Sequence, residues 1–136
     1  MLRTRLVEPY TATGRAVFPE RARPGVYLIF RAGVLRYVGY SRSDVYKALY
    51  RHFQRWSDGS RPYPRATYPK ANGTKVRVIY TTNPGQASRL ERALIVRFRP
   101  LDNPSQLSTF DLSEQDRNEL ASAAASPWAD LGPAPF

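Results

Sequence analysis

The sequence predicts an α+β domain in which a small three-stranded antiparallel sheet is flanked by helices. Segments 26–31, 34–39 and 76–81 have the length, the apolar pattern and the residue types of strands. Two further segments repeat apolar residues at intervals of three and four, which is typical of helices. The order along the chain is strand, strand, helix, strand, helix, and a small sheet packed against helices is an α+β arrangement.

The first two strands are expected to form a hairpin. Between them, Ala32-Gly33 has the residue types of a tight turn. Antiparallel pairing would bring Tyr27 and Tyr37 near each other on adjacent strands, on the same face if the register allows it. Gly39, at the end of the second strand, indicates either a close approach of another group or a simple turn.

The segment Ser41-Arg42-Ser43-Asp44 predicts the start of the first helix. A hydroxyl side chain followed three residues later by a carboxylate is the pattern of a capping box. The helix is expected to run to about Trp56. Its inward face comprises Val45, Ala48, Leu49, His52, Phe53 and Trp56, and its outer face carries Lys47, Arg51 and Arg55.

Residues 57–75 are rich in Pro, Gly, Ser and Thr, so a long loop is expected here. Basic and aromatic side chains alternate along it: Arg61, Tyr63, Arg65, Tyr68, Lys70 and Lys75. This combination suits contacts with phosphates and stacking on exposed bases. A disordered surface loop is the other interpretation.

The second helix is expected over 84–98, with Asn83 as its cap and Pro84 in its first turn. Its apolar face consists of Ala87, Leu90, Leu94 and Phe98. Glu91 falls within the same arc. Burial of an unpaired carboxylate costs several kcal/mol, so Glu91 requires a basic side chain, a hydrogen-bond network or a metal ion as its partner.

Three regions are expected along the chain. Residues 1–23 form a basic N-terminal extension that is loop-like and has no clear element, and 24–110 form the main domain. Residues 111–136 form an acidic tail that includes a short helix over 114–125, capped by Ser113 or Asp111. The last few residues are expected to fray.

The composition excludes several classes of protein. With 136 residues, of which 42% are hydrophobic, the chain is long enough for one compact domain with a real core. It has no cysteine and one histidine, so neither a disulfide framework nor a zinc site made of Cys or several His residues is expected. Neither a membrane-spanning run nor the apolar core of a signal peptide is visible, so an intracellular, cytoplasmic location is expected.

The charge is the strongest compositional signal. The chain carries +10, but residues 111–136 hold five acidic residues and one basic residue, so this tail carries −4 and residues 1–110 carry +14. A body this basic indicates a polyanionic partner, most simply a nucleic acid. An anionic membrane is the alternative, but no basic amphipathic helix with a bulky apolar face is visible.

Five features in this order resemble the GIY-YIG nuclease family. Gly25-Val26-Tyr27 and Tyr37-Val38-Gly39 are similar to the two tripeptides of the family name, with valine in place of isoleucine. Arg51-His52-Phe53 follows on the first helix, Glu91 lies on the second, and Asn103 comes after it. The resemblance covers roughly residues 24–104. It implies a metal-dependent endonuclease that hydrolyses phosphodiester bonds in DNA, with RNA as an alternative substrate.

The resemblance implies specific roles for two side chains. Glu91 would be the single protein ligand of Mg²⁺ or Mn²⁺, with water in the other positions, since hard cations take oxygen ligands. A salt bridge to a nearby arginine is the alternative. Tyr27 would be the general base that activates water, provided that surrounding cations lower its pKa. Packing of its ring in the sheet is the alternative for Tyr27.

Three further side chains complete the expected catalytic set. Tyr37 would orient the water or the phosphate, and His52 would contact the phosphate or transfer a proton. Arg51 would neutralise the charge that develops on the phosphate. For the tyrosine and the histidine, plain core packing is the alternative.

The expected nucleic-acid contacts are Lys47, Arg55, Arg61, Arg65, Lys70 and Asn103. Asn103 would otherwise brace the site through its amide or be a plain turn residue before Pro104. Sequence specificity would come from the loop, a homodimer or a protein partner.

One position departs from the family pattern. Where members carry an arginine, one turn before His52, this chain has Ala48, and Arg51 or Lys47 would be the substitute cation. A nucleic-acid-binding module of the same fold without catalysis is therefore the alternative function. A scaffold whose basic surface meets an acidic protein is a third hypothesis.

Overall fold

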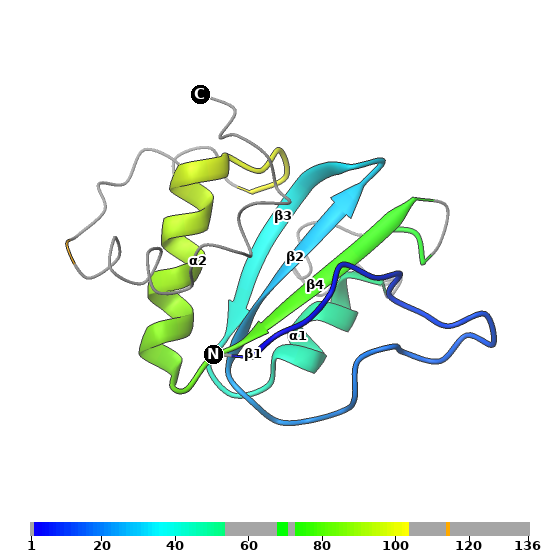
Figure 1. The fold of residues 1–136 in the computed structure, drawn as a ribbon, viewed down its shortest axis with the longest axis horizontal. Coiled ribbons are helices and arrows are strands. Elements are labelled where there is room, and N and C mark those ends of the chain that lie inside the picture. Colours follow the sequence, from blue (N-terminus) through cyan, green and yellow to red (C-terminus); the bar gives the residue numbers. More distant parts are fainter. Residues whose placement is uncertain (1, 54–67, 71–72, 104–113, 115–136) are drawn as a thin grey trace, which may run out of the picture.

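The fold is that of a computed structural model, which describes residues 2–53, 68–70, 73–103 and 114. β2 (Gly25–Arg31), β3 (Val34–Ser41) and β4 (Thr74–Tyr80) form the body of an antiparallel sheet (Figure 1). A two-residue strand, β1 (Leu2–Arg3), extends it in the order β1-β4-β2-β3. The predicted α+β class is therefore confirmed, with a fourth strand that the sequence did not indicate.

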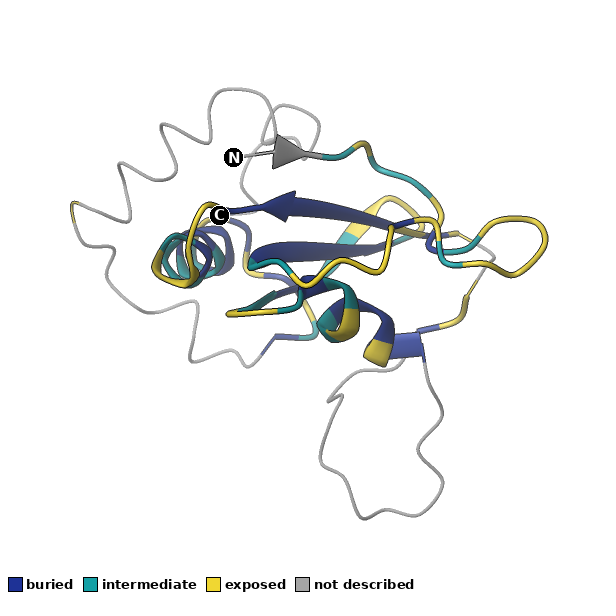
Figure 2. Ribbon diagram, turned by 90° about the horizontal axis from the view of Figure 1, so that it is seen from below, coloured by how far each residue is buried: buried dark blue, intermediate teal, exposed yellow. Residues whose placement is uncertain are grey.

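A helix packs on each face of the sheet, so β2 is buried on both sides. Tyr27 and Ile29 belong to the core that contains α1 (Val45–Tyr50), which we call the α1-side core. Val26 and Leu28 belong to the α2-side core, which contains α2 (Pro84–Phe98). Figure 2 shows the buried strands in dark blue, with α2 seen end-on beside them and α1 below them. Burial on both faces explains why the strand is an almost continuous apolar run.

The predicted β2–β3 hairpin is confirmed. Ala32 and Gly33 both have left-handed backbone angles, with φ of 50° and 80°, and Arg31 pairs with Val34 across the turn. Positive φ at both central residues is the geometry of the tight turns whose twist matches that of a hairpin. In the resulting register, Tyr27 lies opposite Gly39 and Ile29 lies opposite Tyr37.

The first helix starts later and ends earlier than predicted. Its N-cap is Asp44, whose carboxylate accepts a hydrogen bond from the Lys47 N–H, whereas Ser41 is the last residue of β3. The Ser41 hydroxyl accepts the Asp44 N–H, so it stabilises the turn that precedes the helix. The helix tightens into a 3-10 turn at Arg51–Phe53. Trp56 lies outside the described residues.

The basic N-terminal extension is part of the domain. Beyond β1, Val7 bridges to Val76 at the edge of β4. The Tyr50 hydroxyl donates a hydrogen bond to the Pro9 carbonyl at 2.7 Å and accepts one from the Phe18 N–H at 3.2 Å. A strand of two residues is too short to show alternation, which is why the sequence did not reveal it.

The second helix has the predicted boundaries. Asn83 caps it by accepting the Gln86 N–H, and Arg99 ends it with a left-handed φ of 45°. The chain then returns to the outer edge of β3. Of the predicted helix over 114–125, only Glu114 is described. Within the described segments, no helix combines the length and apolar character needed to cross a bilayer.

Candidate active site

A buried tyrosine and the single histidine of the chain form the centre of the candidate site. The Tyr27 hydroxyl lies 2.7 Å from Nε2 of His52, and both side chains are buried. Gly39 makes room for this pair, because a Cβ at position 39 would collide with the ring and hydroxyl of Tyr27. Of the two interpretations of Gly39, the structure therefore supports the close approach.

Two more tyrosines enclose the histidine. The ring of Tyr37 stacks on Tyr27, with centroids 6.1 Å apart, and lies 4.7 Å from the His52 ring. The two phenols therefore share a face of the sheet, as their spacing predicted. Tyr68 lies on another side of the imidazole, with ring centroids 6.0 Å apart. Aromatic rings at these separations are in the range of favourable ring–ring contacts with the imidazole.

Glu91 is half-buried on α2, the helix that runs beside β3 in Figure 1. Burial raises the pKa of its carboxyl to about 7, and the nearby Arg92 only partly opposes this. Within the described chain, the carboxylate accepts no hydrogen bond and forms no ion pair. The structure therefore does not support the alternative of a buried salt bridge for Glu91.

The electrostatic surroundings of Tyr27 connect these residues. Burial raises the pKa of Tyr27 well above its ordinary value, and the nearby Tyr37 and Glu91 raise it further. Arg51 acts in the opposite direction without reversing the shift. The condition that surrounding cations lower this pKa is not met by the protein's own side chains, because desolvation disfavours the phenolate more than one exposed guanidinium favours it.

Two charged side chains act on the phenol of Tyr27. Glu91 raises its pKa through its negative charge, and Arg51 lowers it through its positive charge. Arg51 is exposed at the start of the 3-10 turn. The structure therefore brings Tyr27, Tyr37 and His52 together, from β2, β3 and the 3-10 turn, while Glu91 on α2 and Arg51 act electrostatically on the phenol of Tyr27.

The carboxylate of Glu91 is the donor in this site that suits a divalent cation. Among the described residues, no group of three or more His, Cys, Asp or Glu side chains gathers as a metal site. A half-buried carboxylate with no hydrogen bond or ion pair among the described residues can bind a hard cation that keeps most of its waters. Glu91 is therefore the residue of this site that would hold Mg²⁺ or Mn²⁺.

The position that departs from the family pattern contributes no cation. Ala48 is partly buried and packs against the α1-side core. Arg51 and Lys47 are both exposed, and of the two only Arg51 acts on the pKa of Tyr27. Arg51 is therefore the better candidate for the substitute cation.

Some expected nucleic-acid contacts have a described position. Lys47 is exposed, and Lys70 is exposed with its Nζ 5.0 Å from the ring centroid of Tyr10. Arg55, Arg61 and Arg65 lie outside the described residues.

Asn103 has the bracing position that the sequence offered as an alternative. Its Oδ1 accepts the Val38 N–H and its Nδ2 donates to the Val38 carbonyl, both at 2.9 Å. The side chain is buried and completes the hydrogen bonding of the β3 edge. Its amide is thus engaged by the backbone and is not directed at a nucleic acid.

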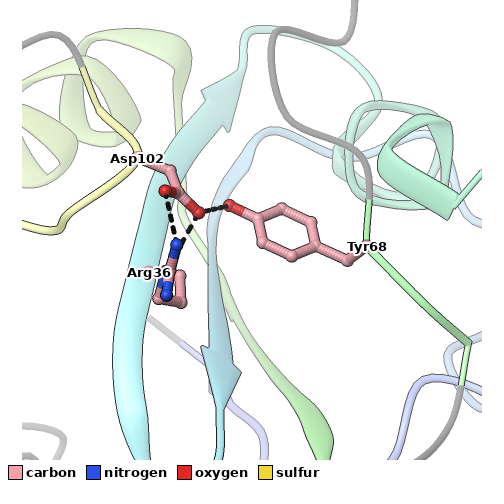
Figure 3. A network of polar contacts seen from close by, with 3 residues as sticks. All are labelled: Arg36, Tyr68 and Asp102. Atoms are coloured by element: carbon pink, nitrogen blue, oxygen red, sulfur yellow. Dashed lines mark hydrogen bonds and ion pairs between the residues drawn. The ribbon is translucent and has the colours of Figure 1, made fainter.

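Tyr68 was expected to stack on exposed bases, but it is buried. Its hydroxyl donates to Oδ2 of Asp102 at 2.7 Å, and Asp102 also accepts two hydrogen bonds from Arg36 (Figure 3). Sequence reasoning missed this network, because Tyr68 follows a loop with no periodicity and Asp102 lies in a short turn. No local pattern links residues that are 34 and 66 positions apart.

Comparison of the chain with models of protein families, with curated proteins and with solved structures finds no match.

Proposed function

We propose that this chain is a metal-dependent endonuclease that hydrolyses phosphodiester bonds in DNA. The observation that carries the proposal is the hydrogen-bonded Tyr27–His52 pair, with one carboxylate and one guanidinium that act electrostatically on its phenol. The resemblance of the two tripeptides supports the same function. A phenol, an imidazole, a carboxylate and a cation together can activate water and stabilise the charge of a phosphate.

The proton path is set by the high pKa of Tyr27. Because burial disfavours the phenolate, Tyr27 acts as a base only if its own proton leaves as the water proton arrives. Nε2 of His52, 2.7 Å from the hydroxyl, is the acceptor for that proton when the imidazole is neutral. His52 is thus the proton-transfer partner of Tyr27, one of the roles that the resemblance implies.

The charged residues Glu91 and Arg51 have different electrostatic roles. Glu91 would hold Mg²⁺ or Mn²⁺, which supplies Lewis-acid stabilisation of the phosphate and the leaving oxygen when bound. Arg51 is exposed beside the pair and offers a bidentate contact to the incoming phosphate. Tyr37, stacked on Tyr27, would orient the attacking water.

The net charge of +10 suits a substrate that is a polyanion. Contacts with phosphates would dominate the affinity, so binding should weaken steeply with salt and depend little on sequence. A homodimer or a protein partner would supply specificity and the second cut of a double-strand break. RNA shares the phosphate chemistry, and a parallel assay with an RNA of equal length distinguishes the substrates.

Cleavage of supercoiled plasmid in Mg²⁺ or Mn²⁺ tests the proposal. We expect nicked and then linear DNA with the wild type, and none after EDTA, with Glu91→Ala or with Tyr27→Phe. Glu20→Ala removes an exposed carboxylate and should cut normally. Both inactive variants should still retard DNA in a gel. Cleavage that survives Glu91→Ala would refute the metal site.

A binding module without catalysis is the second candidate, and Ala48 is the observation that favours it. A partly buried alanine cannot neutralise a phosphate. This candidate predicts retardation of DNA that falls with salt and no cleavage in either metal. A scaffold for an acidic protein would instead show no DNA affinity at low salt.

A further inference from the structure

The network of Arg36, Tyr68 and Asp102 joins three segments that surround the candidate site. Arg36 belongs to β3, Tyr68 lies between the 3-10 turn and β4 in the sequence, and Asp102 follows α2 (Figure 3). Arg36 directly precedes Tyr37 in β3, and Tyr68 is hydrogen-bonded to the turn of His52. Asp102 follows the helix of Glu91. The network therefore connects the elements that carry the proposed catalytic groups.

His52 needs support from outside its own element. It lies in a 3-10 turn, where hydrogen-bond geometry is poorer than in an α-helix. Tyr68 supplies that support twice, because its N–H donates to the His52 carbonyl at 2.8 Å and its ring packs against the imidazole. Both the backbone and the side chain of His52 thus contact Tyr68.

Tyr68 is itself held in place by Asp102. The phenol donates to Oδ2 at 2.7 Å, and the guanidinium of Arg36 binds both carboxylate oxygens, at 3.1 and 2.9 Å. The Asp102 N–H also donates to the Arg36 carbonyl at 2.7 Å. Because its N–H and both carboxylate oxygens are hydrogen-bonded, Asp102 holds the phenol oxygen of Tyr68 in one position.

We infer that Tyr68 is a positioning residue for His52 and that Asp102 acts through Tyr68. This role rests on the proposed function, because it matters for catalysis only if His52 accepts the proton of Tyr27. Proton transfer requires the imidazole to stay within a few tenths of an ångström of its working position. The phenol of Tyr68 has its hydroxyl committed to Asp102 and takes no part in the chemistry.

The test compares Tyr68→Phe with Tyr50→Phe. Each substitution removes one buried, hydrogen-bonded phenol oxygen from the α1-side core, but the Tyr50 hydroxyl serves Pro9 and Phe18 and not Asp102. His52 is the single histidine of the chain, so its imidazole ¹⁵N signals report ring tautomer and mobility without ambiguity. Plasmid cleavage and DNA binding are measured on the same samples.

We expect Tyr68→Phe to change the tautomer ratio or linewidths of His52 and to lower kcat about tenfold at unchanged KM. Tyr50→Phe should lower stability by a similar amount and leave both readouts at wild-type values. If Tyr68→Phe and Tyr50→Phe give the same His52 signals and the same kcat, the network is only structural and the inference is overturned.

A second variant guards against loss of folding in Tyr68→Phe. Asp102→Asn keeps the shape of the side chain but leaves one oxygen for Arg36 and Tyr68 together. It should therefore change the imidazole signals of His52 in the same direction as Tyr68→Phe, by a smaller amount. An unchanged His52 in this variant overturns the inference. If the wild type does not cut DNA, the proposed function fails, and the imidazole signals alone decide whether Tyr68 orients His52.

Discussion

The two faces of the sheet carry cores of different chemistry. The α2-side core is mainly aliphatic, with Leu28, Ile79, Leu90 and Leu94 fully buried. The α1-side core is rich in tyrosine and lies against the buried imidazole of His52. Burial of a hydroxyl or an imidazole is costly without a hydrogen bond, and here the phenols of Tyr27, Tyr50 and Tyr68 all have one. One face therefore stabilises the fold, whereas the other holds polar groups in fixed positions.

Glu91 should show the sharpest separation between activity and stability. We expect Glu91→Ala to lower the cleavage rate about a thousandfold, because it removes the proposed metal ligand. Its free energy of unfolding should stay equal or rise, because the lost carboxylate is half-buried and has no hydrogen bond or ion pair within the described segments. Urea denaturation beside the plasmid assay checks both. A large loss of stability would mean that Glu91 has a structural partner.

Leu28 should show the opposite pattern. Leu28→Ala opens a cavity in the α2-side core, and we expect a loss of about 2–5 kcal/mol in the free energy of unfolding. At temperatures where the variant is folded, cleavage per folded molecule should stay near the wild-type value. A specific loss of activity would show that the two faces are not separate in function.

Gly39 lies where the sheet meets the phenol of Tyr27. Gly39→Ala forces the Tyr27 ring to move, at a cost of about 1–3 kcal/mol in stability. We expect the cleavage rate to fall with it, since the 2.7 Å contact with His52 depends on the ring position. Gly33→Ala strains a turn residue with a φ of 80° but places its Cβ in open space, so it is the control that loses stability without contact with Tyr27. Normal cleavage by Gly39→Ala would contradict the role of the close approach.

Acid should weaken the network of Asp102, with a smaller effect on stability than the substitutions above. Burial alone would raise the pKa of Asp102, but hydrogen bonds from Arg36 and Tyr68 keep it below its ordinary value. A carboxyl with a lowered folded-state pKa stabilises the protein above its unfolded-state pKa, and this contribution is lost as pH falls through the folded-state pKa. Stability of the wild type, but less so of Asp102→Asn, should therefore drop below about pH 4. Stability that falls equally with pH in the wild type and in Asp102→Asn would contradict this.

Local patterns predicted most of the fold. The apolar period of α2, its Asn83 cap and the Ala32-Gly33 turn are properties of neighbouring residues, so they could be read from the sequence. β1 and the start of α1 were missed, because a two-residue strand has no period and Ser41 and Asp44 both match the residue types of a cap.

The candidate site was predictable only in part. The spacing of Tyr27 and Tyr37 and the face of Glu91 are local patterns; the two tyrosine rings stack, and Glu91 acts electrostatically on Tyr27. The raised pKa of Tyr27 was not predictable, because it depends on burial and on side chains that are distant in the sequence. The contacts of Tyr68 with His52 and Asp102 join distant segments and leave no local signal.

The central claim is that a cation on Glu91 lies beside the Tyr27–His52 pair. Mn²⁺ is paramagnetic and broadens the NMR signals of nearby nuclei, so titration of the metal while observing the single His52 imidazole tests the claim most directly. We predict selective broadening of the imidazole signals in the wild type and its loss in Glu91→Gln. Broadening that persists in Glu91→Gln, or an imidazole that Mn²⁺ never affects, would contradict the account.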